Sequence, residues 1–142
     1  MAQDIDVSRH IAAPPAAVWK LLDDSSTWPD WTSIDSHEEE RERDPATGLG
    51  EIRLFHTGRI TVREEIVERE PERRLSYSLL GGLPVRDYVA VIDLTAAEGG
   101  TDLRWHTTFD GRFPATGWIF RLALGKATRD FVAGLDRAAT GV

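Results

Sequence analysis

The chain has 142 residues and no cysteine, so we expect a single domain spanning residues 1–142 that needs no disulfide or metal to stabilise its core. The lack of cysteine excludes thiol catalysis and cysteine-ligated zinc, and it favours a cytoplasmic location because many secreted proteins of this size carry disulfides. A net charge of −7 disfavours nucleic acid as a partner, and no run approaches the roughly 18 apolar residues of a membrane span.

The start of the chain predicts a strand followed by one or two short helices. Residues 3–12 alternate between apolar and polar side chains, which is typical of a strand with one buried face. Two prolines end this strand and suit the first turn of a helix over residues 15–23. Pro29 then prevents a simple continuation of that helix. We expect Trp28, beside this proline, to pack the helical segment against the sheet.

The middle of the chain predicts an antiparallel meander. Apolar side chains recur at every second position almost throughout residues 33–109, with short turns between the segments. The predicted strands are residues 33–44, 50–58, 59–70, 75–81, 86–96 and 101–110. The first of them is almost entirely charged, so we expect an edge strand whose charges discourage pairing with other molecules.

The end of the chain predicts one long helix over residues 115–139, because its apolar side chains form a continuous stripe at steps of three or four. Gly125 and Gly134 each cost this helix about 1 kcal/mol relative to alanine, which indicates close packing or room for a ligand. The order of elements predicts an α+β fold. A curved antiparallel sheet of six or seven strands wraps around the long C-terminal helix, with one or two short helices after the first strand.

We predict an apolar cavity between the sheet and the last helix, because one helix about 37 Å long cannot fill the whole concave face of a curved sheet. The strand alternation assigns to its wall the side chains of Leu54, His56, Tyr77, Tyr88, Ile92, Trp105 and Thr107. Further side chains are expected at its mouth or on the covering helix: Trp31, Trp118, Phe120 and Leu124. The alternation over residues 59–68 stays ambiguous, because an inward phase for its apolar residues would carry Glu64 inward as well.

Four stretches carry a resemblance to a known superfamily. They are IAAPPAAVWKLLDDSSTWPDW (residues 11–31), EEIVEREPERRLSYSL (64–79), GGTDLRW (99–105) and the long last helix. Over nearly the whole chain they resemble the START-like (SRPBCC) superfamily of polyketide cyclase/dehydrase and lipid-transport proteins, which shares the helix-grip fold with pathogenesis-related proteins of the birch-pollen-allergen type. The resemblance implies a cavity that opens near the loops beside the start of the last helix. It implies no catalytic residue, because the superfamily has no invariant catalytic signature.

Three side chains are candidates for acid–base chemistry at this cavity. His56 would transfer a proton, because histidine titrates near neutral pH; the alternative is a rim histidine bonded to water. Tyr88 would orient a ligand oxygen through its hydroxyl, and Arg59 would polarise a keto oxygen, as pocket tyrosines and arginines do in related cyclases. Otherwise Tyr88 is a core residue and Arg59 a surface residue. The four histidines lack the spacing of a metal site, so we expect no metal and no cofactor.

Three functions remain open. The first is binding of a small hydrophobic molecule, such as a lipid, polyketide or aromatic metabolite, in the cavity. The second is an enzyme of the polyketide cyclase, aromatase or dehydratase type that uses tyrosine, histidine and arginine groups of the same cavity. The third is a protein-interaction module, co-chaperone-like or toxin-like, whose cavity is small or collapsed. The expected partner is a small hydrophobic molecule, and the chain is expected to be a monomer or a homodimer.

Overall fold

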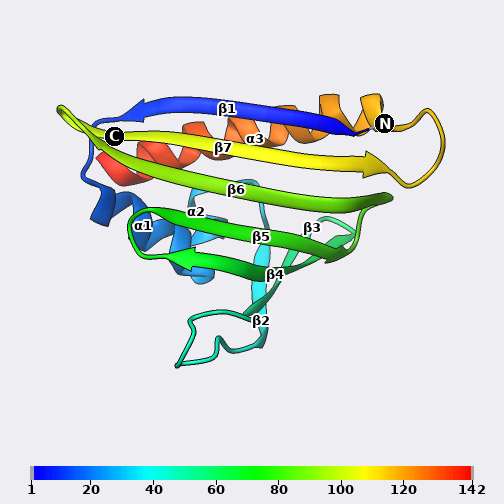
Figure 1. Ribbon diagram of the computed structural model, residues 1–142, viewed down its shortest axis with the longest axis horizontal. Coiled ribbons are helices and arrows are strands. Elements are labelled where there is room, and N and C mark those ends of the chain that lie inside the picture. The colour runs from blue at the N-terminus through cyan, green and yellow to red at the C-terminus, as the bar shows by residue number, and fades with distance from the viewer. Residues whose placement is uncertain (1, 142) are drawn as a thin grey trace.

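The computed structural model describes residues 2–141, which form a seven-stranded antiparallel sheet with a long helix packed along it (Figure 1). The strands are β1 (Gln3–Ile11), β2 (Ser36–Arg41), β3 (Ile52–Thr57), β4 (Ile60–Glu70), β5 (Arg74–Gly81), β6 (Val85–Ala97) and β7 (Gly100–Gly111). The helices are α1 (Pro15–Asp23), the 3-10 helix η1 (Ser25–Thr27), α2 (Trp28–Trp31) and α3 (Gly117–Thr140). These elements confirm the predicted α+β helix-grip fold.

The strand order in the sheet is β1-β7-β6-β5-β4-β3-β2. It follows the chain from β2 to β7, which confirms the predicted meander, and β1 pairs with β7 along its whole length. The predicted charged strand over residues 33–44 is shorter in the structure, because β2 pairs with β3 only from Ser36 to Arg41 and its register shifts after Glu39. As expected, this strand forms one edge of the sheet.

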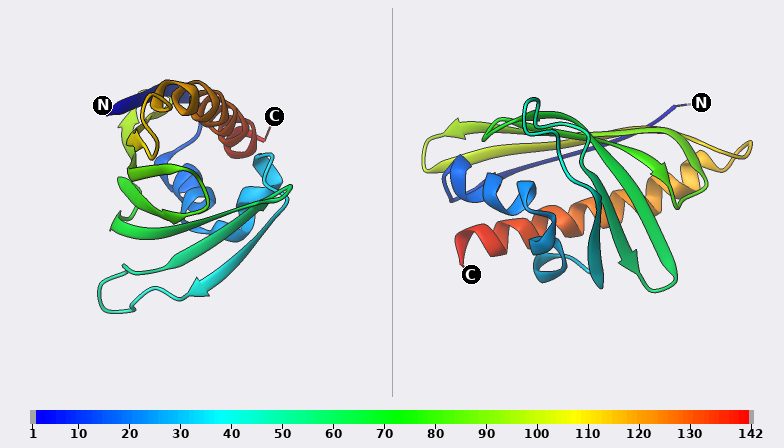
Figure 2. Two further views of the ribbon diagram at one scale, coloured as in Figure 1. Left: turned by 90° about the vertical axis from the view of Figure 1, so that its right-hand side faces the viewer. Right: turned by 90° about the horizontal axis from the view of Figure 1, so that it is seen from below.

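The sheet curls so that its concave face looks toward the helices. In the end-on view of Figure 2, the strands and the helices surround a common interior. α3 packs along β1 and β7 and also contacts α1 and α2. Among residues 2–141, no helix combines the length and the hydrophobicity needed to cross a bilayer.

The short helices follow from the local sequence. Pro15 stands in the first turn of α1, where its missing N–H has no partner to lose. The Asp24 carboxylate caps η1 by accepting a hydrogen bond from the Ser26 amide at 3.0 Å. The Thr32 hydroxyl donates to the Trp28 carbonyl at 2.6 Å at the end of α2. These local stops turn the chain so that Trp28 faces the sheet.

Trp28 lies at the centre of the core and is 1 % exposed. Its ring stacks on Phe55 of β3 at 5.0 Å between centroids and meets Trp105 of β7 edge-on at 5.8 Å. Its indole N–H donates to the Leu22 carbonyl at 3.2 Å, so its polar atom is satisfied. The prediction that Trp28 packs the short helices against the sheet is therefore confirmed.

The two glycines inside α3 have different surroundings. A Cβ at Gly134 would collide with the backbone carbonyl of Trp31, so this glycine lets α3 pack directly on the end of α2. A Cβ at Gly125 would meet only the flexible end of the Arg129 side chain, at 3.4 Å. Close packing therefore explains Gly134 but not Gly125.

This difference predicts opposite effects of two alanine substitutions. Gly134→Ala is expected to lower the free energy of unfolding by about 2 kcal/mol, because α3 must move away from α2. Gly125→Ala is expected to raise it by up to about 1 kcal/mol, because alanine is the better helix former. Urea unfolding of both variants measures the two changes, and equal changes of the same sign would contradict the packing explanation.

Candidate ligand-binding cavity

A cavity of about 220 Å³ lies between the sheet and α3. Strands β3 to β6 contribute Phe55, Thr57, Ile60, Val62, Glu64, Tyr77, Leu79 and Tyr88. The helix α3 contributes Leu124, Ala127, Thr128 and Phe131. A mostly apolar wall with a few polar groups is typical of sites for small molecules. The predicted position of a cavity, between sheet and final helix, is therefore confirmed.

Glu64 brings a carboxyl group to the wall of this cavity. It lies on β4 between Val62 and Ile66, which also face the interior, so the ambiguous alternation over residues 59–68 resolves with Glu64 inside. Glu64 is 8 % exposed, and its carboxyl group has no hydrogen bond or ion pair within the described residues. Burial raises the pKa of Glu64 to about 8, with a smaller opposing effect of the Arg53 guanidinium. Most Glu64 side chains are therefore protonated at neutral pH.

Arg53 lies opposite Glu64 on β3, but its guanidinium is committed to other partners. It donates to the Leu22 carbonyl at 3.1 Å, to the Asp23 carbonyl at 2.6 Å and to the Glu51 carboxylate at 3.1 Å. These bonds tie the end of α1 to β3. Because Glu51 already balances the charge of Arg53, Glu64 stays unpaired.

Tyr77 and Tyr88 both line the cavity, with their ring centroids 6.5 Å apart. Burial raises the pKa of both phenols, and the charge of Glu64 raises it further. Their hydroxyl groups therefore stay protonated at neutral pH and can donate hydrogen bonds. The two phenols also interact with each other, and with Trp105 and Thr107 respectively, whereas the Glu64 carboxyl group has no such partner in the described part of the chain.

Leu54 and His56 lie on the opposite face of β3, so their predicted inward placement is wrong. The His56 ring is hydrogen-bonded to Thr61 at 2.8 Å and to Glu38 at 3.0 Å on that outer face. This strand carries apolar side chains in both phases, and the packing of Phe55 in the core decides between them. His56 is therefore not positioned to transfer a proton inside the cavity.

Four other predicted wall residues lie in the solid core and do not line the cavity: Trp31, Ile92, Trp105 and Thr107. Their burial is as expected, and for Trp105 the space in front of the ring is filled. The Trp105 ring packs against Trp28 at 5.8 Å and against Phe131 at 6.0 Å. The aromatic cluster thus confines the cavity to the space under residues 124–131 of α3.

Of the remaining residues predicted for the cavity, one lines it and three do not. Leu124 lines the cavity, as predicted. Phe120 is half-buried and Trp118 is exposed, and neither lines it, because the first turn of α3 extends past the cavity. Arg59 is exposed in the turn between β3 and β4 and is not part of the wall. The predicted cavity positions of Phe120, Trp118 and Arg59 are therefore wrong.

Sequence reasoning missed Arg53 as a buried residue. Phe55 could have indicated it: side chains two positions apart on a strand share a face, so if Phe55 points into the core, Arg53 does so as well.

Among residues 2–141, no group of three or more His, Asp or Glu side chains is arranged to hold a metal ion. The chemistry of the cavity therefore depends on Glu64 and the two tyrosines.

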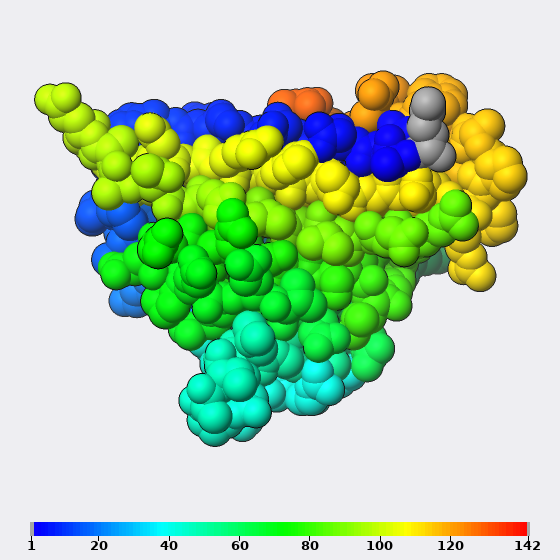
Figure 3. Space-filling view, in the orientation of Figure 1, coloured from blue at the N-terminus to red at the C-terminus, as the bar shows by residue number. Residues whose placement is uncertain are grey.

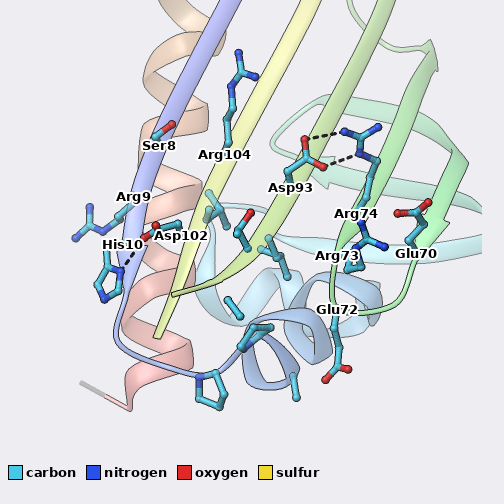
Figure 4. Close-up of a pocket in the computed structure, with 17 residues that line it drawn as sticks. Ser8, Arg9, His10, Glu70, Glu72, Arg73, Arg74, Asp93, Asp102 and Arg104 are labelled. Carbon is cyan, nitrogen blue, oxygen red and sulfur yellow. Dashed lines mark hydrogen bonds and ion pairs between the residues drawn. The ribbon is translucent and has the colours of Figure 1, made fainter. Parts of the chain in front are cut away.

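A larger, open groove of about 1360 Å³ lies where β1 finishes and α1 begins (Figure 4). Its charged side chains pair with one another, as in Arg74 with Asp93 at 2.6 Å and His10 with Asp102 at 2.8 Å. Solvent-exposed ion pairs of this kind contribute little energy. The small cavity is the better candidate site, because Glu64 is both buried and unpaired there.

Solved structures share this fold across proteins with different names and sources. A protein from Thermobifida fusca aligns with a TM-score of 0.80 and 24% identity, over 96% of this chain and 92% of that chain. The di-domain ARO/CYC StfQ from the steffimycin biosynthetic pathway aligns with a TM-score of 0.82 and 16% identity, over 100% of this chain and 53% of that chain. Ara h 8.0201 aligns with a TM-score of 0.76 and 17% identity, over 100% of both chains. The chain thus has the helix-grip fold that these structures share.

The family described as polyketide cyclase/dehydrase and lipid transport matches residues 2–142. The chain therefore belongs to this family, as the resemblance in its sequence implied. No functionally curated protein matches the sequence. The description of this family names both cyclase/dehydrase and lipid-transport functions.

Proposed function

We propose that the protein binds a small, mostly apolar molecule in the cavity and that Glu64 makes the polar contact that orients it. The observation that carries this proposal is the buried Glu64 carboxyl group, which has no partner at an otherwise apolar wall. An unpaired buried polar group costs free energy. A guest that accepts a hydrogen bond from Glu64, or takes its proton, removes that cost. Membership of the family supports this function.

The volume of the cavity limits the size of the guest. Pockets for drug-sized molecules measure about 300–1,000 Å³, and an engineered apolar cavity of about 150 Å³ takes up benzene. The cavity here measures about 220 Å³. It therefore favours a compact aromatic metabolite with one or two rings over a lipid or a long polyketide chain.

Toluene and benzylamine are suitable probes, because they have the same ring and differ in one amino group. Ligand-observed NMR titration measures the affinity of each. We expect benzylamine to bind more tightly to the wild-type protein, and Glu64→Gln to remove this preference. Ala127→Leu is expected to abolish binding of both probes, because Ala127 lines the cavity.

The matched control for the filled cavity is Ala123→Leu. Ala123 is exposed one turn earlier on α3, so the same added side chain lies in solvent and binding is expected to stay unchanged. Unchanged binding in the Ala127→Leu protein would contradict the proposed site.

A second function uses the same groups for catalysis. A carboxyl group with a pKa near 8 is matched to proton transfer at neutral pH, and the two tyrosines of the same wall would polarise a carbonyl group of a guest. An enzyme of the cyclase or dehydratase type would lose turnover in the Glu64→Gln protein while still binding toluene. A binding protein would show no turnover in either form.

A further inference from the structure

The start of α3 and the loop before it expose apolar side chains. Among residues 2–141, eight large apolar side chains are exposed, and four of them lie between residues 113 and 122. They are Phe113, Trp118, Ile119 and Leu122, with exposed fractions of 56, 54, 47 and 60%. We call these four side chains the apolar tip. The spacing of the last three places them together on the solvent side of the first two turns of α3.

The charge around the apolar tip differs in sign from that of the rest of the chain. Residues 111–129 contain Arg112, Arg121, Lys126 and Arg129 and no acidic residue, whereas the remaining chain has 13 basic and 24 acidic residues. Lys126 pairs with Asp130 at 2.7 Å. Arg121 and Arg129 have no ion pair within the described residues. The tip therefore carries unpaired positive charge on an otherwise acidic protein.

The shape of the apolar tip also distinguishes it from a pocket. The loop between β7 and α3 projects beyond the end of the sheet (Figures 1 and 3). Neither the cavity nor the open groove includes any of its four side chains. Protruding apolar side chains flanked by arginines fit a fluid surface, which needs no complementary shape. They match the pattern of interfacial segments, in which aromatic and aliphatic residues enter the headgroup boundary and basic residues contact anionic lipids.

The apolar tip lies at the same end as part of the cavity wall. The Arg112 amide donates to the Pro84 carbonyl at 3.0 Å, which ties the β7–α3 loop to the loop that carries Leu83. Leu83 lines the cavity, and so does Leu124, two residues after Leu122. A partner bound to the apolar tip would therefore lie beside the cavity. The binding of this partner does not depend on whether the cavity holds a guest.

We propose that the apolar tip docks on the surface of an anionic lipid bilayer. Trp118 and Leu122 enter the boundary between headgroups and acyl chains, and Arg121 and Arg129 contact the phosphates of anionic lipids. The attachment is peripheral and reversible, and it weakens with ionic strength because part of it is electrostatic.

Co-sedimentation with phospholipid vesicles tests this proposal. The protein is expected to bind vesicles of phosphatidylcholine and phosphatidylglycerol and to bind vesicles of phosphatidylcholine alone much more weakly. Trp118 is the exposed member of the five tryptophans, since the other four are buried. Its fluorescence is therefore expected to shift to the blue on binding, and Trp118→Phe is expected to remove the shift while the protein still binds.

Two pairs of variants separate the tip from the rest of the surface. Arg121→Gln is expected to weaken vesicle binding about five-fold, whereas Arg73→Gln, an exposed arginine in the turn between β4 and β5, is expected to change nothing. Leu122→Ser is expected to weaken it about ten-fold, whereas Leu80→Ser, which changes an exposed leucine of β5, is expected to have no effect.

Several results would overturn the proposal. They are equal binding to both kinds of vesicle, no fluorescence shift, or equal losses in the tip variants and their controls. Protection of Trp118 by self-association without lipid, seen as an oligomer that dissociates on dilution, would instead assign the tip to a second copy of the chain.

Discussion

Replacing Trp28 with alanine is expected to lower the free energy of unfolding by about 3–5 kcal/mol, as for large aromatic residues truncated in other cores. Trp28 touches more of the core than its position in a four-residue helix suggests. Its ring lies 4.9–6.5 Å, between centroids, from the rings of Trp31, Phe55, Trp105, Phe131 and Tyr77. Its loss would leave a void between the short helices, the sheet and α3.

Trp118→Ala is the matched control for this change. Trp118 is exposed, so the same truncation is expected to change the free energy of unfolding by no more than about 0.5 kcal/mol. Urea unfolding followed by circular dichroism measures both variants. A loss of less than about 1 kcal/mol for Trp28→Ala would show that the aromatic cluster closes around the void, and that Trp28 does not organise the core.

The architecture is predictable from the sequence because its signals are local. Alternation with period two identifies a strand, and an apolar stripe at steps of three or four identifies a helix, whichever elements they pack against. The six predicted strands over residues 33–110 and the helix over residues 115–139 all appear in the structure. Short connections between them then leave the antiparallel meander as the simplest sheet.

The wall of the cavity is less predictable, because contacts between distant residues decide it. Both faces of β3 carry apolar side chains, and Phe55 faces inward because Trp28, which comes from another element, stacks on it. Trp105 has the predicted inward phase but lies in solid core, because Trp28 and Phe131 fill the space in front of it. Alternation gives the face of a strand, but it does not show whether that face meets a cavity or another side chain.

Glu64 shows where local and tertiary signals conflict. A charged residue on a strand is expected to face solvent, but β4 buries its neighbours Val62 and Ile66 on the same face. The apolar neighbours determine the phase, and Glu64 follows them inside. Such a conflict between a residue and its surroundings is typical of a functional site.

This buried carboxyl group is expected to make the protein less stable as the pH rises. In the unfolded chain a glutamate has a pKa of about 4.3, and in the folded protein the pKa of Glu64 is about 8. Between these values the folded state holds a proton that the unfolded state has lost, so stability falls with increasing pH through this window. By pH 7 the accumulated cost is about 3–4 kcal/mol.

Glu64→Gln removes this titration, so the free energy of unfolding of the variant relative to wild type is expected to rise by about 1.4 kcal/mol for each pH unit between pH 5 and pH 7. Taking the difference between the two proteins cancels the contributions of the histidines and of the other carboxylates, which both proteins share. Urea unfolding at several pH values measures it. Glu40→Gln is the control, because the hydrogen bond from the Arg63 guanidinium lowers the pKa of this exposed carboxyl group, and its difference from wild type is expected to stay flat over this range. A flat difference for Glu64→Gln as well would mean that Glu64 titrates like an exposed glutamate, and the polar contact proposed for the guest would then come from the tyrosine hydroxyl groups alone.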